Sequence, residues 1–508
     1  MDLAAAGLGL PDRDYYLLDN KEIVVAREAY KAYVATMLKL VGAPHAQERA
    51  DKVFALETEM AKANWPRSER RNRDKMYNPM SYAELKMLAP EFAWDAFFAD
   101  TDIPLKDGAR QIIVGEKSAF PALAKLFAAT PVAVWRDYLT VHYLHAYAEY
   151  LPQRFDNVDF AFYGTVIGGR TQQFERETRG VRMLDREIGE ALGKIYVARY
   201  FPPESKAKVE RLVANLLKAY EEDIKSLTWM SPETKAKALE KIRLFTPHIG
   251  YPDKWRDYSK LVISRNDLIG NVKRGALFDW NRNVSRLDQP VDKTEWLMTP
   301  ETVNAYYLRN FNSITFPAAI LQPPFFDPNA DDAVNYGGIG VVIGHEISHG
   351  FDDQGSKYDG LGNKQNWWTA DDRANFEVRK KMLSDQYDTY EPLPGLKIRG
   401  AQTLGENIAD LAGLTIALKA YRISLEGKPA PTLDGFTGDQ RLFMSLAQVW
   451  RVKFQEGDLR NRILSDFHSP GPFRVRGMTR NIDAWYGAFD VKPGDKYFLP
   501  LDQRVRLW

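Results

Sequence analysis

The segment GGIGVVIGHEISHG, residues 337–350, is predicted to form a buried helix. His345 and His349 are four residues apart, so on a helix their side chains share one face, roughly 5–6 Å apart at Cβ. That spacing suits chelation of one divalent ion. Glu346 is one step round the helix, near enough to reach a metal-bound water without binding the metal itself. Because a chance HExxH match is expected on the order of once in a hundred such chains, the motif needs support from other residues.

A third metal ligand has to come from a separate segment. The extended three-histidine pattern fails, because Asp352 stands where it requires Gly and Gly355 where it requires His. Glu406 and Asp410 are four residues apart and project from one face of another predicted helix. Glu406 can complete a His₂Glu zinc site, and Asp410 can accept a hydrogen bond from a zinc histidine. The alternative is an ordinary acidic first helical turn, stabilised by the helix dipole.

The composition excludes several other classes of protein. The 508 residues can form two or more domains, and the 45% hydrophobic and 27% charged residues are typical of a globular protein. The 69 Lys and Arg residues balance 68 Asp and Glu residues, which gives no electrostatic case for nucleic acid or an anionic membrane. The chain has no cysteine, so disulfides, cysteine-ligated metal sites and thiol catalysis are excluded.

No segment for export or membrane insertion is expected within the chain. Residues 1–8 lack the charged and long apolar regions of a signal peptide. No stretch reaches the roughly 18 apolar residues of a membrane span. We therefore expect a cytoplasmic protein, or a periplasmic or extracellular one if an export signal lies upstream.

The periodicity of apolar residues changes near residue 262. Before it, apolar residues recur at three- and four-residue steps, which predicts helices at 23–40, 46–62, 132–150, 184–199 and 203–227. Ser231 and Pro232 look like a capped start of one more helix. After it, short strands are predicted at 303–308, 313–316 and 396–399, among long helices. The pattern favours a mainly helical domain at 1–262 and an α+β domain at 263–508.

Seven segments, including those of the metal site, match a known pattern that extends over nearly the whole chain: residues 7–16, 248–252, 303–307, 317–326, 335–368, 405–413 and 466–470. Together they resemble the neprilysin family of zinc endopeptidases (family M13), which includes endothelin-converting enzymes and bacterial oligopeptidases. The resemblance implies a mostly α fold with a smaller α+β part. It implies a thermolysin-like zincin catalytic domain at 263–508 and a large helical capping domain at 1–262.

The resemblance also implies roles for the residues of the metal site. His345, His349 and Glu406 would bind one Zn²⁺ per chain. Glu346 would be the general base that acts on a zinc-activated water. Asp410 would be the hydrogen-bond partner of a zinc histidine.

Further matching positions imply contacts with a peptide. His468 would stabilise the oxyanion, with Asp466 orienting it. Arg474 would hold a substrate carbonyl, and Asn304 and Ala305 would pair with the peptide as an added strand. The apolar pocket for the residue after the cleaved bond would be lined by Ile320, Phe325, Val342, Val449 and Trp450.

Several of these residues have a simpler interpretation. Val342, Val449 and Trp450 at helical positions are typical core residues. Arg474 could be a solvated surface charge, and His468 a structural histidine. His142 and His145 mimic a metal pair but have no acidic partner at the family's spacing, so the pair at 142 and 145 is read as packed or surface histidines.

Members of the family usually run well beyond 508 residues, and the segment at Gly7 normally lies well inside their chains. The resemblance therefore implies that helical material before Gly7, which helps to enclose the substrate in the family, is missing from this chain. The chain would still carry all of the family's catalytic residues.

The expected function is hydrolysis of oligopeptides on the N-terminal side of large hydrophobic residues, by a monomeric zinc endopeptidase that binds neither nucleic acid nor membrane. Two alternatives remain open. One is a zinc-stabilised peptide-binding protein without activity, which chelator-sensitive cleavage of a peptide would exclude. The other is a zinc hydrolase of non-peptide amides, against which the strand-like segment 303–306 argues, because an edge strand suits an extended peptide.

Overall fold

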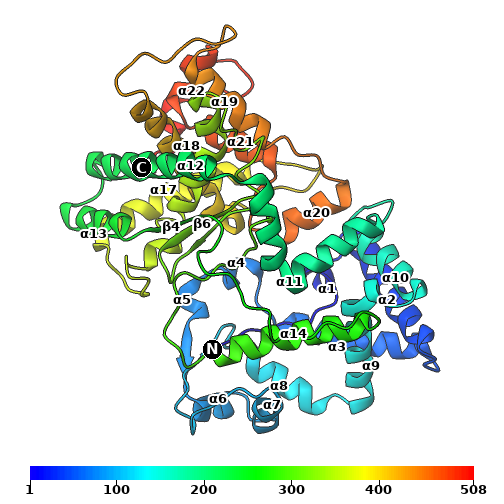
Figure 1. Cartoon of the computed structure of the whole chain (residues 1–508). Coiled ribbons are helices and arrows are strands. Elements are labelled where there is room, and N and C mark those ends of the chain that lie inside the picture. The colour runs from blue at the N-terminus through cyan, green and yellow to red at the C-terminus, as the bar shows by residue number, and fades with distance from the viewer. Residues whose placement is uncertain (508) are drawn as a thin grey trace. The chain divides into compact units, whose positions relative to one another are not determined.

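A computed structural model describes residues 1–507 (Figure 1). These residues form two compact units. The described residues form 22 α-helices and two three-stranded sheets. The first unit contains residues 1–179, 259–290 and 454–465, and the second contains residues 180–258, 291–453 and 466–507. In residues 1–507, no helix has both the length and the apolar character required to cross a bilayer.

The first unit is a bundle of helices with one small sheet. Its helices are α1 Asp14–Leu17, α2 Lys21–Leu40, α3 Ala46–Ala63, α4 Arg67–Arg70, α5 Arg73–Met76, α6 Tyr82–Leu88, α7 Trp94–Asp100, α8 Ala119–Ala129, α9 Val132–Tyr147, α10 Gln153–Asp159, α14 Leu268–Ser285 and α20 Glu456–Ser465, with a 3₁₀ turn at Ala148–Tyr150 and a π-helix at Phe160–Ile167. In its sheet, β3 (Ile112–Val114) lies between β1 (Asp2–Leu3) and β2 (Asn78–Met80), parallel to β1 and antiparallel to β2.

A buried carboxylate joins the main helices of this unit. Glu57 of α3 is fully buried and accepts hydrogen bonds from the hydroxyls of Tyr16 and Tyr30, at 2.7 and 2.9 Å. His142 Nε2 of α9 lies 2.7 Å from the same carboxylate. His145 instead contacts Asp159 at 2.7 Å. The two histidines therefore face different carboxylates, in agreement with their interpretation as packed histidines.

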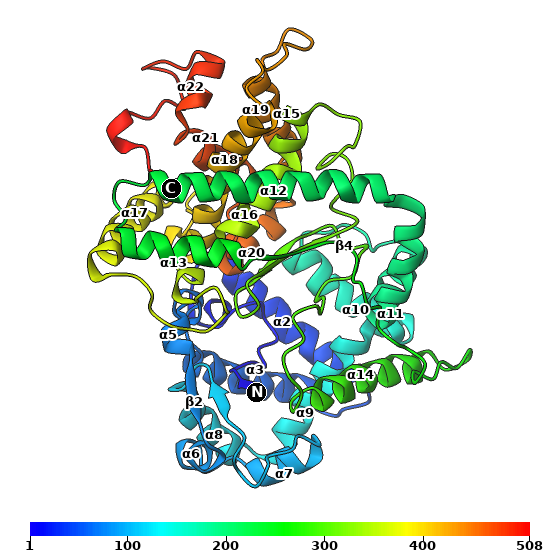
Figure 2. The same cartoon turned by 60° about the vertical axis from the view of Figure 1, so that its left-hand side comes forward.

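The second unit packs long helices around one central helix, α18. Its helices are α11 Arg176–Tyr200, which begins in the first unit, α12 Pro203–Ser226, α13 Pro232–Arg243, α15 Asp332–Asn335, α16 Val341–Ser348, α17 Ala370–Asp388, α18 Gly400–Ser424, α19 Gly438–Val449, α21 Gly471–Thr479 and α22 Asp483–Phe489, with a π-helix η3 at Tyr336–Gly340 and 3₁₀ turns at Gly355–Lys357 and Leu501–Gln503. Helices α12, α16, α17 and α21 all contact α18, and α12 runs across both α16 and α18 (Figure 2).

A short sheet lies beside these helices. Strand β6 (Ser313–Pro317) is central, with β4 (Thr246–Gly250) parallel on one side and β5 (Tyr306–Leu308) antiparallel on the other. Both β5 and β6 contact α16. Every residue of β6 is buried. Within residues 1–507, β5 pairs with β6 alone and so presents a free edge.

Most predicted elements are present within a few residues of their expected bounds. Ser231 caps α13 by accepting the N–H of Thr234, with Pro232 in the first turn. Of the predicted strand 303–308, only Tyr306–Leu308 pairs in the sheet. The predicted strand 396–399 is wrong: Leu396 makes only an isolated bridge to Leu393, because the chain turns there just before α18 begins.

The compact units do not follow one cut near residue 262. Helices α12 and α13 and strand β4 precede that position, yet α12 packs on α18 and β4 pairs with β6 in the second unit. Residues 259–290 and 454–465 belong to the first unit instead. Packing between segments distant in sequence determines which residues belong to each unit. The local periodicity of apolar residues contains no information about that packing.

A partly buried acidic pair, Asp185 and Glu301, lies where α11 is kinked. Ile188 departs from helical geometry, with φ −141° and ψ 35°. One turn on, Gly193 lets the segment 299–301 approach, since a Cβ there would lie 2.7 Å from Pro300. Burial, together with the neighbouring Asp185, raises the pKa of Glu301 to about 7. Glu301 therefore remains protonated in the folded chain at pH values where an ordinary glutamate is ionised.

This pKa shift predicts a dependence of stability on pH. Between pH about 4.5 and about 7 the folded state keeps a proton that the unfolded state has released, so the stabilisation is complete below pH 4.5 and is lost as pH rises through 7. We expect Glu301→Gln to gain about 1–2 kcal/mol relative to wild type between pH 4.5 and pH 8, allowing for solvent screening. Urea unfolding at both pH values measures this. Glu426→Gln, at an exposed site, is the control, and an equal Glu301→Gln effect at both pH values would contradict the assignment.

Candidate metal centre and active site

Two glycines bring α16 and α18 into close contact. A Cβ at Gly344 would lie 2.7 Å from the carbonyl oxygen of Gly413, and a Cβ at Gly413 would lie 2.6 Å from the backbone nitrogen of His345. Neither position can carry a side chain without separating the helices. The crossing therefore sets the distance between the histidines of α16 and the acidic residues of α18.

Three side chains from these helices converge on one point. The carboxylate oxygen Oε2 of Glu406 lies 3.3 Å from His345 Nε2 and 3.5 Å from His349 Nε2. Ligand atoms of the three residues all lie within 4.8 Å of one another. Because α18 begins at Gly400, Glu406 lies in its second turn, so the alternative of an acidic first turn does not apply.

The donor set fits a divalent metal. Glu406 Oε2 is buried and accepts no hydrogen bond among the described residues, although it faces two imidazole nitrogens. Leaving a buried carboxylate oxygen without a partner is costly. Two imidazoles and one carboxylate are the ligands of His₂Glu zinc sites. Burial raises the pKa of Glu406, but His349 and His468 outweigh it and hold that pKa well below its ordinary value, so the carboxylate is ionised.

Each histidine is oriented by a carboxylate on its other ring nitrogen. Asp410 Oδ1 lies 2.8 Å from His345 Nδ1, as the four-residue spacing from Glu406 predicts. Arg474 donates to both oxygens of Asp410, at 2.7 and 2.6 Å. Burial raises the pKa of Asp410, but Arg474 and His345 overcome it and lower that pKa to about 2. With its outer nitrogen occupied in this way, His345 directs Nε2 toward Glu406.

Arg474 is not a solvated surface charge. It is 5% exposed, and its guanidinium carbon lies 3.9 Å from the ring centroid of Trp450. The ion pair with Asp410 and the stacking on Trp450 fix its position.

Asp352 orients the second histidine, which the sequence did not assign. Its Oδ2 lies 2.8 Å from His349 Nδ1, and its Oδ1 accepts the backbone N–H groups of Gln354 and Gly355 at 2.7 and 2.6 Å. The signal was an acidic residue three positions after the second histidine. It was ambiguous because an aspartate just past a helix also serves as a cap.

A fully buried lysine holds the loop that carries Asp352. Lys241 of α13 is 1% exposed and donates to the carbonyl oxygens of Gly350, Gly355 and Tyr358, at 2.6, 2.9 and 2.7 Å. Burial lowers the pKa of its ammonium group to about 7, against the opposing charge of Asp352. These bonds fasten a loop about 110 residues away in sequence to α13.

His468 approaches Glu406 from a third direction. Its Nε2 lies 3.2 Å from Glu406 Oε2, and its Nδ1 lies 2.8 Å from Asp466 Oδ1. Helix α18 holds this loop as well: Gln402 donates to the carbonyl oxygen of Asp466 at 2.6 Å, and Asn407 accepts from the Ser469 hydroxyl at 2.9 Å. The Asp466–His468 pair predicted from the sequence is therefore present beside the three-residue centre.

Glu346 lies between the two histidines in sequence and is 6% exposed. Burial raises its pKa, while the neighbouring His345 and His349 oppose that shift. A carboxylate with a raised pKa can both accept and return a proton, which is the property required of a general base.

The residues expected to contact a peptide differ in their exposure. Asn304 and Ala305 directly precede β5 and lie outside its pairing, Asn304 exposed and Ala305 buried. Of the five apolar residues, Ile320 and Val449 are buried, and the other three are partly buried against the core: Phe325, Val342 and Trp450. The core interpretation of Val449 therefore agrees with its burial, whereas the last three keep some surface.

A His-Glu-x-x-His helix, a glutamate from a second helix and a short sheet with a free edge beside them define the zincin class of metallopeptidases. Two patterns of Peptidase family M13 match the chain, the N-terminal one over residues 1–252 and the other over residues 304–505. The chain belongs to peptidase family M13.

Individual relatives agree with this assignment. The chain is 34% identical to neprilysin-11 of Caenorhabditis elegans and 33% identical to human endothelin-converting enzyme 1, over 96% of this chain and 60% and 65% of theirs. It is 44% identical to the Mycobacterium tuberculosis zinc metalloprotease Zmp1, whose inhibitor complex superposes with a TM-score of 0.96 over 100% of this chain and 78% of that one.

These comparisons also test the predicted fold. The predicted fold, mostly α with a smaller α+β part of thermolysin-like zincin type, is confirmed. The chain spans about three fifths to two thirds of the length of the curated relatives it matches. The N-terminal part of the family pattern matches residues 1–252, and the expectation that helical material before Gly7 is missing stays a prediction.

Proposed function

We propose that this chain is a zinc endopeptidase that hydrolyses oligopeptides, preferentially on the N-terminal side of large hydrophobic residues. The observation that carries the proposal is the buried Glu406 carboxylate facing Nε2 of both His345 and His349, with Glu346 on the same helix. His345, His349 and Glu406 would hold one Zn²⁺. When bound, the ion supplies a Lewis acid that activates water and polarises the scissile carbonyl.

Three other side chains of the site each have a separate role in the reaction. Glu346 accepts the proton of the attacking water and returns it to the leaving amine. His468, held by Asp466, donates a hydrogen bond to the oxyanion as it develops. Arg474, held by Asp410 and Trp450, donates to a carbonyl oxygen of the peptide near the cleaved bond.

The peptide binds in extended form. Asn304 and Ala305 continue the free edge of β5 and pair with its backbone, as an added strand would. The side chain after the cleaved bond enters an apolar site formed by Ile320, Phe325, Val342, Val449 and Trp450. The partial exposure of Phe325, Val342 and Trp450 supports this assignment.

We propose that the chain acts as a monomer on oligopeptides, and that the helices before residue 262 that belong to the first unit restrict access to the site, so that folded proteins are excluded. Chelator-sensitive cleavage of a synthetic peptide tests the function. Zinc binding without any cleavage would favour a peptide-binding protein instead.

We expect Asp352→Asn to weaken zinc binding by about 10–100-fold, because an outer carboxylate fixes the orientation and basicity of its histidine. Competition with a chromogenic chelator measures the zinc dissociation constant. Asp385→Asn, at an exposed position of α17, is the matched control. An unchanged zinc affinity in Asp352→Asn would show that His349 does not depend on this contact.

A further inference from the structure

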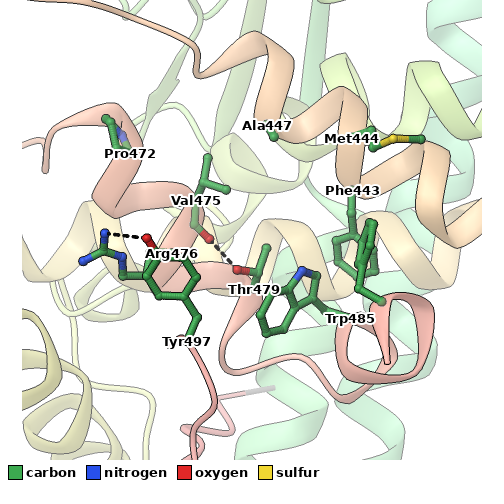
Figure 3. A pocket seen from close by; sticks show the side chains of 10 residues that line it. Phe443, Met444, Ala447, Pro472, Val475, Arg476, Thr479, Trp485 and Tyr497 are labelled. Atoms are coloured by element: carbon green, nitrogen blue, oxygen red, sulfur yellow. Dashed lines mark hydrogen bonds between the residues drawn. The ribbon is translucent and has the colours of Figure 1, made fainter. Parts of the chain in front are cut away.

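An apolar cavity of about 530 Å³ lies in the second unit, between α19, α21 and α22 (Figure 3). Its lining includes Phe443 and Met444 of α19, Trp485 of α22, and Tyr497. This volume is within the range of small-ligand sites. No aspartate or glutamate is among its lining residues.

The cavity is separate from the metal centre. Helix α21 contributes Val475 and Arg476 to its lining, whereas Arg474 of the same helix bonds to Asp410 at the metal site. Adjacent residues of α21 therefore belong to two different sites, Arg474 to the metal centre and Val475 and Arg476 to the cavity. Occupation of the cavity requires none of the metal-site residues.

Two polar groups that line the cavity, on Arg476 and Trp485, can donate further hydrogen bonds. Arg476 forms no ion pair among the described residues: its guanidinium donates to the Tyr497 hydroxyl at 3.4 Å and stacks on the rings of Tyr497 and Phe473 at 4.7 and 4.9 Å. The indole N–H of Trp485 has no acceptor in the described part of the chain. The Thr479 hydroxyl, in contrast, is already bonded to the carbonyl oxygen of Val475 at 2.9 Å.

An apolar cavity that offers donors and one uncompensated cation complements an apolar group attached to an anionic acceptor. A carboxylate satisfies the planar fork of arginine with two parallel hydrogen bonds. An aromatic or branched side chain fills the space beside Phe443 and Trp485. These two features occur together in the last residue of a peptide that ends in a large apolar amino acid.

We propose that this cavity binds the free C-terminal residue of a peptide ending in a large apolar side chain, with its carboxylate on Arg476. The choice of a peptide as occupant rests on the proposed peptidase function, whereas the chemistry of the site rests on the cavity itself. The site is a second peptide-binding position outside the metal centre.

The test uses N-acetylphenylalanine and its C-terminal amide as probes, titrated into the full zinc-loaded chain by calorimetry. We expect the acid to bind about 10-fold tighter than the amide, because only the acid makes charge-assisted bonds. Arg476→Gln should remove this difference, and Arg422→Gln, at an exposed position of α18, should retain it. Ala447→Trp, which fills the cavity, should weaken both probes.

Repeating the titration with Glu406→Ala separates this site from the metal centre. Unchanged preference for the acid in that variant supports the cavity even if the chain proves to have no peptidase activity. Equal binding of acid and amide to wild type would overturn the proposal. So would a preference for the acid that survives Arg476→Gln or disappears in Glu406→Ala.

Discussion

Replacing Glu346 with glutamine is expected to lower turnover of a peptide by about 10²–10⁴-fold while leaving zinc content unchanged. Glutamine keeps the size of the side chain but cannot accept the proton of the attacking water. Because Glu346 is next to His345 without sharing its metal-facing position, the ligand set stays intact. Initial rates on a fluorogenic peptide, with zinc measured by mass spectrometry on the same sample, test both parts.

Glu377→Gln provides the control, since this exposed glutamate on α17 pairs with the neighbouring Lys380 on the same helix. It should cleave at the wild-type rate. If Glu346→Gln retains more than about a tenth of wild-type turnover with full zinc, another group moves the proton and the proposed mechanism is wrong.

Replacing Glu406 with alanine is expected to empty the metal site. Binding free energies of protein zinc sites are about 10–16 kcal/mol, so one ligand of three accounts for about 3–5 kcal/mol, or about 10²–10⁴-fold in affinity. The variant also leaves His345, His349 and His468 without the carboxylate that all three face. Dialysis against a weak chelator, followed by metal analysis, should find little zinc in Glu406→Ala.

The matched control is Glu240→Ala, on the exposed face of α13, which should keep one zinc per chain. Thermal unfolding of both variants without zinc separates loss of the ligand from loss of the fold. A folded Glu406→Ala chain that still binds one zinc with wild-type affinity would remove Glu406 from the ligand set.

The sequence predicts the metal centre well because its spacings are local. Two histidines four residues apart must share a helical face, and so must Glu406 and Asp410, whatever the rest of the chain does. The pairing of His345 with Asp410 follows once the two helices meet. What brings them together is a pair of glycines, Gly344 and Gly413.

Other parts of the site depend on contacts that no spacing reveals. Lys241 reads as an ordinary lysine in the last turn of an amphipathic helix, and only the fold buries it against three carbonyl oxygens of the loop after His349. From the sequence, Arg474 looks like a surface arginine similar to Arg476. In the structure, Asp410 and Trp450 enclose it. Lys241 and Gly350 are 109 residues apart in sequence, and Arg474 and Asp410 are 64 residues apart.

The strand prediction at 396–399 failed for a related reason. A short run such as Leu396–Ile398 is compatible with a strand or a turn, and pairing partners decide between them. Here Leu396 bridges only Leu393, and the backbone N–H of Gly400 at the start of α18 binds Asp388 at 2.6 Å. The conformation of residues 396–399 therefore depends more on the nearby start of the buried helix α18 than on the residue types in this segment.

The central claim is that one zinc centre on α16 and α18 hydrolyses peptides before large hydrophobic residues. Mass-spectrometric mapping of cut sites in a mixed peptide library tests it most directly, with chelator-treated enzyme and Glu346→Gln as parallel samples. We expect cuts concentrated on the N-terminal side of Phe, Leu, Ile and similar residues, absent from both parallel samples. Intact peptides after incubation with zinc-loaded wild type, or the same cuts in Glu346→Gln, would contradict the claim.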